Sequence, residues 1–378
     1  MGKTRVVEFT EAWTPGGVES YIINIAENLN KDKFDIVIWA TQVYADLFDD
    51  DLKRIGVQLY KPVEVESFVN PIKRTINGVI IFSKTIKDLP CDVIHLHASN
   101  GVAWIYASIA KRNGKKVIFH AHASSLGNRN RNLKMIPHNI CKEMLSGNAD
   151  IRLACSDKAA GFLYPHRYIA KKEVQYINCI IDIERFRFND CIRNEYRLKY
   201  GIDSEETVFL HVGRLQYEKN HYFLLDLFNE ITHTIASKLF IIGEGRELEG
   251  ISSRIKELDL ENKVVLVGKT RKVEKYMFMS DVFVLPSFYE GNPIVTAEAQ
   301  ATGLPCYISN RVTRSAKLLD VSKFIGIDDA KESARIIVAD ISKKTCYTDR
   351  SKAIETVMEK GYNKKKQIEQ LERIYMSV

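Results

Sequence analysis

Short apolar runs alternate with amphipathic stretches along the 378 residues, and this alternation restricts the possible folds more than any other feature. Repeated strand-then-helix patterns predict βαβ units and a largely parallel sheet. The apolar runs are continuous, as expected for strands that are covered on both faces. We predict strands at Val6–Phe9, Asp35–Trp39, Val57–Tyr60, Val93–Leu96, Val117–His120 and Arg152–Cys155, and then at Val208–Val212, Lys238–Ile242, Val264–Val267, Val282–Leu285 and Pro305–Ile308.

A segment rich in charged residues, around 183–205, separates the two series of strands. The length of the chain also suits two domains. We therefore predict an α/β protein of two doubly wound, Rossmann-like domains that face a cleft. Ligands of such sheets bind beyond the carboxyl ends of the strands, so the residues just after strands are the candidates for function.

Composition excludes several classes of protein. The first apolar run is too short for a signal peptide, and no stretch approaches the roughly 18 uncharged residues of a membrane span. The seven cysteines are dispersed without a CxxC pair, which favours reduced thiols over zinc or redox chemistry.

The net charge of +7 is unevenly distributed along the chain, since the segment from Lys111 to Lys172 has thirteen Lys and Arg against three Asp and Glu. That segment indicates an anionic partner, which is nucleic acid, anionic lipid or a phosphorylated substrate.

Glycines and histidines follow the predicted strands of the first series. Gly16-Gly17 precedes an amphipathic helix and is either a site where phosphate approaches a helix N-terminus or a tight turn. HLHASNG and FHAHASS place two pairs of histidines on shared strand faces, His95 with His97 and His120 with His122. His95 fits a core histidine bonded to backbone, whereas His122 at a strand end is expected to face the ligand. A metal site is not expected, because no carboxylate or cysteine at matched spacing is evident nearby.

In the second series, Arg214 follows a strand beside Gly213, and Lys219 comes just before a helix. The planar fork of an arginine and the compact charge of a lysine together suit a diphosphate, although both could also be solvated surface charges. The next strand leads into FIIGEGRELEG, where Gly243 begins a G-x-G but Leu248 stands in place of the third glycine of a dinucleotide fingerprint. We therefore predict a strand-to-helix turn that lines the cleft, and not an NAD site.

The segment FYEGNPIVTAEAQATGLP places Glu290 at the mouth of a predicted helix and Glu298 in its body. Asn292 suits the N-cap and Pro293 the first helical position, while Gly291 lets a ligand come close. A carboxylate among small residues is costly without partners. The partners of Glu298 are either the hydroxyl groups of a ribose or sugar, or a neighbouring arginine.

These motifs together resemble a known family. GGVE, HLH and FHAH, INCIID, GRLQYEKN, GEG and the E-x7-E segment follow the order and spacing found in the retaining, nucleotide-sugar-dependent glycosyltransferases of family 4, which have the two-domain GT-B fold. The resemblance covers nearly the whole chain and is closest to enzymes of bacterial capsule and exopolysaccharide assembly. It implies an N-terminal, acceptor-binding Rossmann-like domain of residues 1–185, a C-terminal, nucleotide-sugar-binding domain of residues 186–360, and a helix at 361–378 that returns to the N-terminal domain.

The resemblance also implies roles for individual residues. Glu298 binds the ribose hydroxyls, Glu290 meets the donor sugar, and Arg214 with Lys219 holds the diphosphate. The expected catalytic residues are His122, Arg214, Lys219 and Glu290. The other expected donor-binding residues are Gly16, Gly17, Gly213, Gly243, Lys269, Gly291, Asn292, Pro293 and Ile294.

We expect transfer with retention through an oxocarbenium-like transition state, with negative charge growing on the leaving diphosphate. Arg214, Lys219 and helix-end amides stabilise that charge, so no metal or other cofactor is expected. The donor is expected to be a UDP-sugar of the hexosyl or N-acetylhexosaminyl type. Asp49-Asp50-Asp51 is read as a surface run and not as a metal motif. The chain departs from the family pattern at Cys179, where glycine is usual, and at Asn292, which is therefore a candidate for influencing the choice of donor sugar.

The basic segment includes RNRNLKMIPHNICKEML, in which Arg129, Arg131 and Lys134 precede an amphipathic run. This combination suits a peripheral helix at an anionic membrane surface, and the alternative is an ordinary basic face without a partner. These three residues and Glu19 are the acceptor-side candidates. We expect a polyprenyl-diphosphate-linked or oligosaccharide acceptor and a cytoplasmic location on the inner face of the membrane. No nucleic-acid motif is present.

Two other functions are compatible with the same architecture. One is a sugar-nucleotide epimerase that works without an acceptor. The other is a partner subunit that keeps the fold without the activity, although the intact Glu290, Glu298, Arg214 and Lys219 argue against it.

Overall fold

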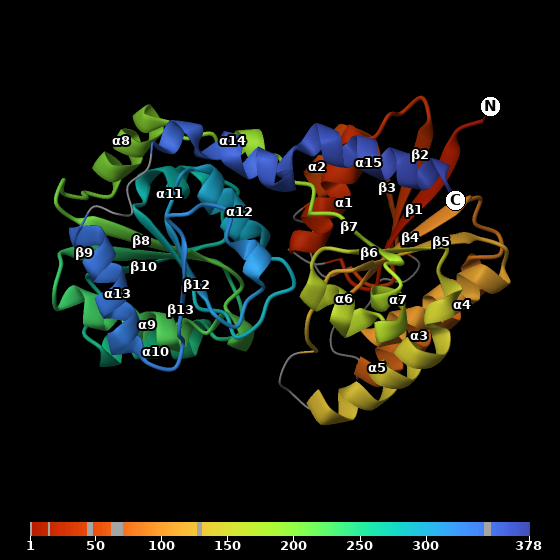
Figure 1. The fold of residues 1–378 in the computed structure, drawn as a ribbon, viewed down its shortest axis with the longest axis horizontal. Helices are drawn as coiled ribbons and strands as arrows, with labels where there is room; N and C mark the ends of the chain where they lie inside the picture. The colour runs from red at the N-terminus through yellow and green to blue at the C-terminus, as the bar shows by residue number, and fades with distance from the viewer. Residues whose placement is uncertain (1, 14–15, 44–47, 62–70, 127–130, 344–348) are drawn as a thin grey trace. The chain divides into compact units, whose positions relative to one another are not determined.

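The structure is a computed structural model that describes residues 2–13, 16–43, 48–61, 71–126, 131–343 and 349–378 (Figure 1). The chain divides into two compact units, Met1–Ile181 with Lys364–Val378 (unit 1) and Asp182–Asn363 (unit 2). These boundaries lie within a few residues of those expected from the sequence. Each unit has helices on both faces of a parallel sheet, so the predicted doubly wound architecture is confirmed.

Unit 1 contains a seven-stranded sheet in the order β3-β2-β1-β4-β5-β6-β7, with every neighbouring pair parallel. Its strands are β1 (Thr4–Thr10), β2 (Phe34–Ala40), β3 (Gln58–Tyr60), β4 (Val93–Ala98), β5 (Lys116–Ala121), β6 (Ile151–Ala154) and β7 (Val174–Tyr176). Its helices are α1 (Gly17–Asn28), α2 (Asp49–Ile55), α3 (Pro71–Thr85), α4 (Trp104–Arg112), α5 (Arg131–Leu145), α6 (Asp157–Leu163), α7 (His166–Ala170) and the returning α15 (Lys364–Met376), with 3-10 turns η1 (Gly101–Ala103) and η2 (Ser146–Asn148).

Unit 2 contains a six-stranded sheet in the order β10-β9-β8-β11-β12-β13, again parallel throughout. Its strands are β8 (Thr207–Val212), β9 (Ser237–Ile242), β10 (Val264–Gly268), β11 (Val282–Leu285), β12 (Cys306–Ser309) and β13 (Lys323–Ile325). Its helices are α8 (Asp190–Lys199), α9 (His221–Thr232), α10 (Leu248–Glu257), α11 (Val273–Met279), α12 (Ile294–Ala301), α13 (Ala330–Ser342) and α14 (Ala353–Val357). Shorter turns are η3 (Ile183–Phe186), η4 (Tyr217–Lys219), η5 (Arg314–Ala316), η6 (Arg350–Lys352) and the π-turn η7 (Met358–Tyr362).

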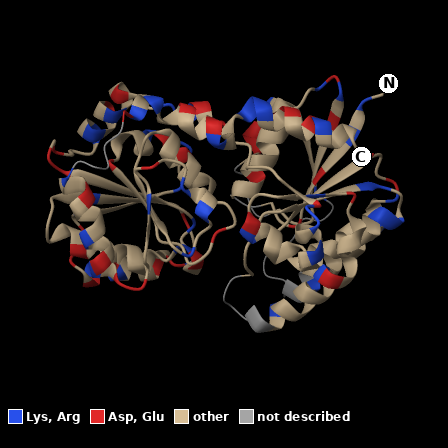
Figure 2. Cartoon of the chain, viewed as in Figure 1, with Lys and Arg blue, Asp and Glu red and all other residues tan. Residues whose placement is uncertain are grey.

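Every strand predicted from the sequence is present, and the two strands that the sequence did not indicate are β7 and β13. Both are three-residue strands at a sheet edge, VQY and KFI, so they lack the apolar run that marks a central strand. Charge follows the same division, since Figure 2 shows charged residues mainly on helices and loops and strands that are mostly uncharged. A clear exception is Glu8, which is fully buried in β1.

The strand order reverses once in each sheet, between β1 and β4 in unit 1 and between β8 and β11 in unit 2. At such a switch point the connections on either side run to opposite faces and leave room beyond the carboxyl ends of the strands. The residues that follow these four strands are therefore positioned to meet a ligand.

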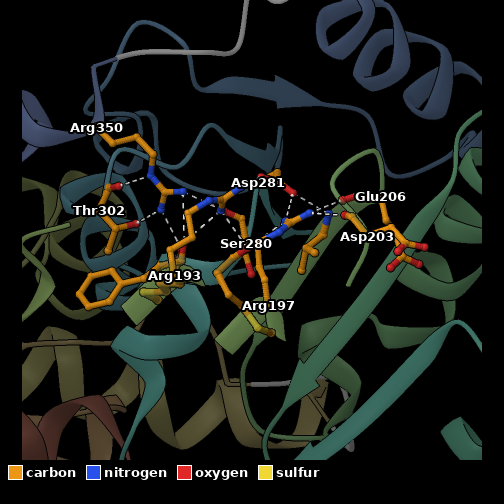
Figure 3. Close-up of polar contacts among 12 residues, drawn as sticks. Arg193, Arg197, Asp203, Glu206, Ser280, Asp281, Thr302 and Arg350 are labelled. Atoms are coloured by element: carbon orange, nitrogen blue, oxygen red, sulfur yellow. Dashed lines mark hydrogen bonds and ion pairs between the residues drawn. The ribbon is translucent and has the colours of Figure 1, made fainter. Parts of the chain in front are cut away.

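Arginines near the start and near the end of unit 2 bind to the core of that unit (Figure 3). Arg193 and Arg197 of α8 bind Asp281 at 2.5 and 3.1 Å. Arg350 of η6 donates to backbone carbonyl groups at the ends of α11 and α12, namely those of Met277, Phe278, Ser280 and Thr302. Gly303, at φ +76°, leaves room for this contact, since a Cβ there would lie 2.6 Å from the Arg350 Cα. One guanidinium thus satisfies several carbonyl groups that a helix end leaves without partners.

We predict that Arg350→Lys lowers the free energy of unfolding of unit 2 by about 2–4 kcal/mol, because an ammonium group cannot reach all of these carbonyl groups and some stay buried without a donor. Hydrogen exchange of the α11 amides would report the change. Arg335→Lys on α13, whose side chain is 78% exposed, is the matched control. Equal exchange in both variants would show that water replaces the arginine at little cost.

Candidate functional site

The switch point of unit 2 brings together two predicted site residues from distant parts of the sequence. Lys219 lies in η4 after β8, and Glu290 lies in the loop after β11. Lys219 Nζ is 2.6 Å from Glu290 Oε1, and both side chains are about 85% shielded from solvent. Ser287 Oγ also donates to Glu290 Oε1, at 2.9 Å. The pair therefore holds one positive and one negative charge side by side beyond the ends of β8 and β11.

Glycines bring the neighbouring loops of unit 2 into close contact. A Cβ on Gly243, at φ +146°, would lie 1.9 Å from the carbonyl oxygen of Gly213. A Cβ on Gly245 would lie 2.2 Å from the carbonyl oxygen of Leu215, whose own amide donates to Glu244 O at 2.9 Å. The G-x-G is thus a strand-to-helix turn, as predicted. Its glycines are required because two backbone segments pack against each other.

Two of the predicted site residues on these loops are exposed cations. The Arg214 side chain is 53% exposed and makes a long ion pair of 3.7 Å with Glu218. Lys269 is exposed and directly follows Gly268, whose carbonyl oxygen accepts from the Gly243 amide at 3.0 Å. Both side chains can therefore turn toward an anion without breaking a strong contact.

The helix at the mouth of this region begins one residue later than the sequence suggested. α12 starts at Ile294, and its N-cap position is occupied by Pro293 with no side-chain cap. The predicted cap, Asn292, instead bonds with the hydroxyl group of Tyr362 at 3.3 Å. Gly291 lies just before this turn and is partly buried. The prediction of Asn292 as the N-cap was wrong, because its side chain has a tertiary partner that competes with local capping.

Glu298 lies one turn into α12 and is only partly exposed. Burial raises the pKa of its carboxyl group to about 7, and although Arg185 opposes this effect, nearby Glu274 adds to it. Arg185 is itself paired with Glu274 at 2.6 Å. Within the described part of the chain, the Glu298 carboxylate has neither a hydrogen bond nor an ion pair. The arginine that the sequence suggested as an alternative partner is therefore already engaged elsewhere, and Glu298 is left as an acceptor for hydroxyl groups.

We predict that Glu298→Gln stabilises the free protein at pH 8. An unfolded glutamate ionises near pH 4.5, whereas the folded one resists ionisation until about pH 7, so the folded state loses stability as the pH rises between these values. The amide removes this loss, which we expect to be about 1–2 kcal/mol because partial exposure reduces the full value of about 1.4 kcal/mol per pKa unit. Urea unfolding at pH 8 and pH 5 should show a clearly larger gain at the higher pH. Glu249→Gln, exposed on α10, is the control, and an equal gain at both pH values would contradict the prediction.

In unit 1, the predicted glycine pair lies at the start of α1. Gly16 is the N-cap, in an extended conformation, and Gly17 is the first helical residue. Glu19 lies in the first turn of this helix and is 4% exposed, so it is not a surface group. The Asp49-Asp50-Asp51 run forms the first turn of α2, where acidic side chains favour the helix N-terminus.

The histidines of β4 and β5, together with His122 directly after β5, form one connected group. His97 Nδ1 lies 3.0 Å from His122 Nε2, and His95 Nε2 lies 3.2 Å from His120 Nδ1. The sequence predicted His95 as a histidine bonded to backbone, but its partners are side chains, including the hydroxyl group of Tyr375 at 2.8 Å. The partial exposure of His122 agrees with its expected position at the open end of the strand.

Sequence reasoning missed the carboxylate of this group. Glu8 of β1 contacts His97 Nε2 at 2.6 Å and His95 Nδ1 at 3.1 Å. The available signal was a charged residue inside the apolar strand RVVEFT, which costs free energy unless it has buried partners. His95, His97 and His120 also have a spacing that could hold a metal ion, with ligand atoms within 4.8 Å of one another. However, both nitrogens of His95 and of His97 are already engaged in hydrogen bonds within this group.

The basic acceptor-side candidates lie at and before α5. Lys134 is exposed on this helix, and Arg131 is its first residue. Arg129 lies outside the described residues. The structure does not bring these residues together with the histidine group through any contact that it describes.

Comparisons with known proteins agree with this geometry. The family profile described as Glycosyltransferase Family 4 matches residues 15–185, and the one described as Glycosyl transferases group 1 matches residues 192–320. The chain is 28% identical over 317 residues to the glycosyltransferase EpsF of Bacillus subtilis (strain 168), covering 82% of this chain and 80% of that protein.

It is also 26% identical to the UDP-Gal:alpha-D-GlcNAc-diphosphoundecaprenol alpha-1,3-galactosyltransferase of Escherichia coli, over 78% of this chain and 76% of that protein. Among solved structures, Anabaena Alr3699/HepE in complex with UDP and glucose superposes with a TM-score of 0.80 at 16% identity, covering 99% of this chain and 100% of that one. The two matched profiles, the relatives matched over most of their length and the fold agree with the resemblance seen in the motifs. The chain belongs to the family 4 glycosyltransferases of the GT-B fold.

Proposed function

We propose that this glycosyltransferase moves a sugar from a UDP-sugar to a saccharide acceptor carried on polyprenyl diphosphate, in the synthesis of a cell-surface polysaccharide. The observation that carries the proposal is the Lys219–Glu290 pair across the switch point of unit 2, with the exposed Arg214 beside it. The names of the relatives support the substrate classes, since one acts on a diphosphoundecaprenol-linked sugar with a UDP donor.

Each part of a nucleotide-sugar has a chemically suitable group in unit 2. Lys219 and Arg214 neutralise the diphosphate, and the first amides of α12 add hydrogen-bond donors at a helix N-terminus. Glu298 accepts from the two ribose hydroxyls, which supply donors that no described residue of the free protein provides. Lys269 and Gly243 lie on the loops that would border the base, and Gly16, Gly17 and His122 of unit 1 are proposed to contact phosphate and sugar.

In the proposed reaction the bond between the sugar and the diphosphate breaks while the acceptor hydroxyl oxygen attacks the same face, so that the anomeric configuration is retained. The proton of that hydroxyl group passes to an oxygen of the leaving diphosphate. Negative charge grows on the leaving diphosphate in this step. Lys219 is released from Glu290 to stabilise that charge, and Glu290 then meets the donor sugar. Because fixed cations and amides supply this stabilisation, the proposed mechanism uses no metal ion.

We predict that UDP raises the melting temperature in the presence of EDTA, while GDP and ADP have little effect. Ligand at 100 times its dissociation constant adds about 2.7 kcal/mol of stability, which a thermal shift detects. Lys219→Ala should abolish the shift with UDP, because it removes the diphosphate contact, and Lys256→Ala, exposed on α10, should preserve it. No shift with any nucleotide would favour the partner-subunit alternative. Conversion of a UDP-sugar without any acceptor would favour the epimerase.

A surface of unit 1 suits a membrane-bound acceptor. On α5 the apolar side chains that point outward recur at helical spacing and are 53–76% exposed: Leu133, Ile136, Ile140 and Met144. The opposite side of the helix is anchored by the buried His138, whose Nδ1 accepts from the Gly101 amide at 2.9 Å. α3, which like α5 packs against α4, exposes Ile76 and Ile80. We call these six apolar residues the outer face.

The described basic residues beside the outer face give it a charge that matches anionic lipid. Lys134 is exposed on α5, and Lys73 and Lys84 are exposed on α3. Apolar side chains that insert between lipids, with lysines at the level of the headgroups, are typical of an interfacial helix. No described helix has both the length and the apolar character needed to cross a bilayer. We therefore propose that the outer face lies on the anionic membrane that carries the acceptor.

We predict that the protein sediments with vesicles containing phosphatidylglycerol and much less with phosphatidylcholine alone. Ile136→Asp with Ile140→Asp should reduce binding at least about tenfold, because each buried isoleucine contributes about 1.5–3 kcal/mol. Leu248→Asp, 45% exposed on α10 of unit 2, should bind like the wild type. Unchanged binding in the double variant would contradict a role for this face.

A further inference from the structure

The carboxylate of Glu8 is the centre of a buried hydrogen-bonded network in unit 1 that includes the four histidines. Glu8, His95 and His120 are fully buried, and His97 is 4% exposed. Glu8 Oε2 lies 2.6 Å from His97 Nε2, and His97 Nδ1 lies 3.0 Å from His122 Nε2. This first arm runs from the interior of the sheet to the strand end where His122 is partly exposed.

The order of donors along this arm follows from the chemistry of its end. An ionised carboxylate only accepts hydrogen bonds, so His97 must donate from Nε2. A neutral imidazole carries one proton, so His97 Nδ1 is then an acceptor and His122 must donate to it from Nε2. The remaining nitrogen of His122, Nδ1, is left with its lone pair. Among the described residues, His122 Nδ1 has no hydrogen-bond partner.

A second arm satisfies the other oxygen of the same carboxylate. Tyr375 of α15 donates to Glu8 Oε1 at 2.5 Å, and His95 Nδ1 lies 2.8 Å from the Tyr375 hydroxyl oxygen. His95 Nε2 continues to His120 Nδ1 at 3.2 Å, and the buried His120 Nε2 has no partner among the described residues. In both arms, each hydrogen bond is therefore donated in the direction of Glu8. Donation in the opposite direction is excluded in either arm.

We propose that Glu8 and His97 are positioning residues that hold His122 as the neutral imidazole protonated on Nε2, so that Nδ1 accepts a hydrogen bond from a sugar hydroxyl group. The inference rests on the proposed function, which places His122 against the sugar. It adds the reason why His122 acts as an acceptor and not as a cation. A buried carboxylate that sets the tautomer of a histidine through a hydrogen bond is a common device in enzyme sites, and here a second histidine extends it by one step.

The charges around the network agree with this assignment. Burial alone raises the pKa of Glu8, but His95 and His97 outweigh it and hold that pKa well below its usual range. Burial and His95 lower the pKa of His97 to about 4, although its bond with Glu8 opposes them. Burial, His97 and His95 likewise hold the pKa of His122 well below its usual range.

Among the described residues, a phenol and two thiols are further titratable groups that face the network. Tyr21 of α1 packs edge-on against three of the imidazole rings, and burial raises the pKa of its hydroxyl group. Cys155, at the end of β6, contacts the carbonyl oxygen of His122 at 3.7 Å, and Cys179 is buried. Burial raises the pKa of both thiols, so they remain neutral near pH 7 and do not change the balance of charge.

Nitrogen NMR of the ¹⁵N-histidine-labelled protein tests the proposal directly, with His122→Asn to assign the signal. In the wild type we expect His122 protonated on Nε2 only, from pH 6 to pH 8 and without any ligand. Glu8→Gln keeps the volume but can donate as well as accept, so we expect a mixture of His122 tautomers. Tyr375→Phe removes a hydroxyl of the second arm and should leave the His122 tautomer unchanged.

A wild-type His122 that is protonated on Nδ1, or doubly protonated, overturns the proposal, as does one metal ion per chain bound to these histidines in the purified protein.

Measurements of the kinetics of sugar transfer distinguish a positioning role of Glu8 from a general structural role. We expect Glu8→Gln to lower kcat about tenfold, the cost of one misplaced hydrogen bond, with little change in the KM for the donor. In the His122→Asn background the same substitution should have no further effect, because Glu8 acts through His122. Additive losses, or an equal loss in His166→Gln, which changes an exposed histidine on α7, would overturn the proposal. If the protein shows no transfer at all, the proposed function fails, and the tautomer measurement still decides the present inference.

Discussion

Parallel pairing between all neighbouring strands is the constraint on which the rest of this structure depends. Because the strands of one sheet point the same way, every loop that follows a strand emerges at the same edge. Residues more than seventy positions apart, such as Lys219 and Glu290, thereby come into contact without any local signal that links them. The single reversal of strand order in each sheet then selects the two strands whose following loops frame the candidate site.

The pKa values of the carboxyl groups of Glu8 in unit 1 and Glu298 in unit 2 are shifted in opposite directions. Glu8 has donors at both oxygens, and the histidines and the tyrosine that supply them keep it ionised inside the sheet. Glu298 has no such donors among the residues that the structure describes, and burial raises the pKa of its carboxyl group to about 7. The first arrangement stabilises the fold at neutral pH, while the second destabilises it. A buried polar group without a hydrogen-bond partner in the free protein is a candidate for ligand binding, because a ligand can supply the missing hydrogen bond.

In the last part of the chain, one side chain in each unit makes hydrogen bonds with more than one partner. Arg350 donates to carbonyl groups at the ends of two helices of unit 2. Tyr375 then brings α15 onto the buried carboxylate of unit 1 at 2.5 Å. Since unit 1 includes residues from both ends of the chain, the hydrogen bonds around its histidines cannot be completed until the C-terminal helix has docked.

The sequence by itself determined the βαβ repeat, two domains, the strand positions and most of the candidate residues, because apolar runs and strand-end motifs are local patterns. It did not indicate β7 or β13, since VQY and KFI contain no run of apolar residues. Tertiary structure decided which candidates meet. It gave Asn292 a partner in Tyr362 instead of a helix cap, and it placed Glu8 among the histidines of two other strands. The partners of a buried polar group on a strand lie on neighbouring strands of the sheet, and these are distant in the sequence. The sequence therefore shows that Glu8 needs a partner, and only the fold shows which residues are its partners.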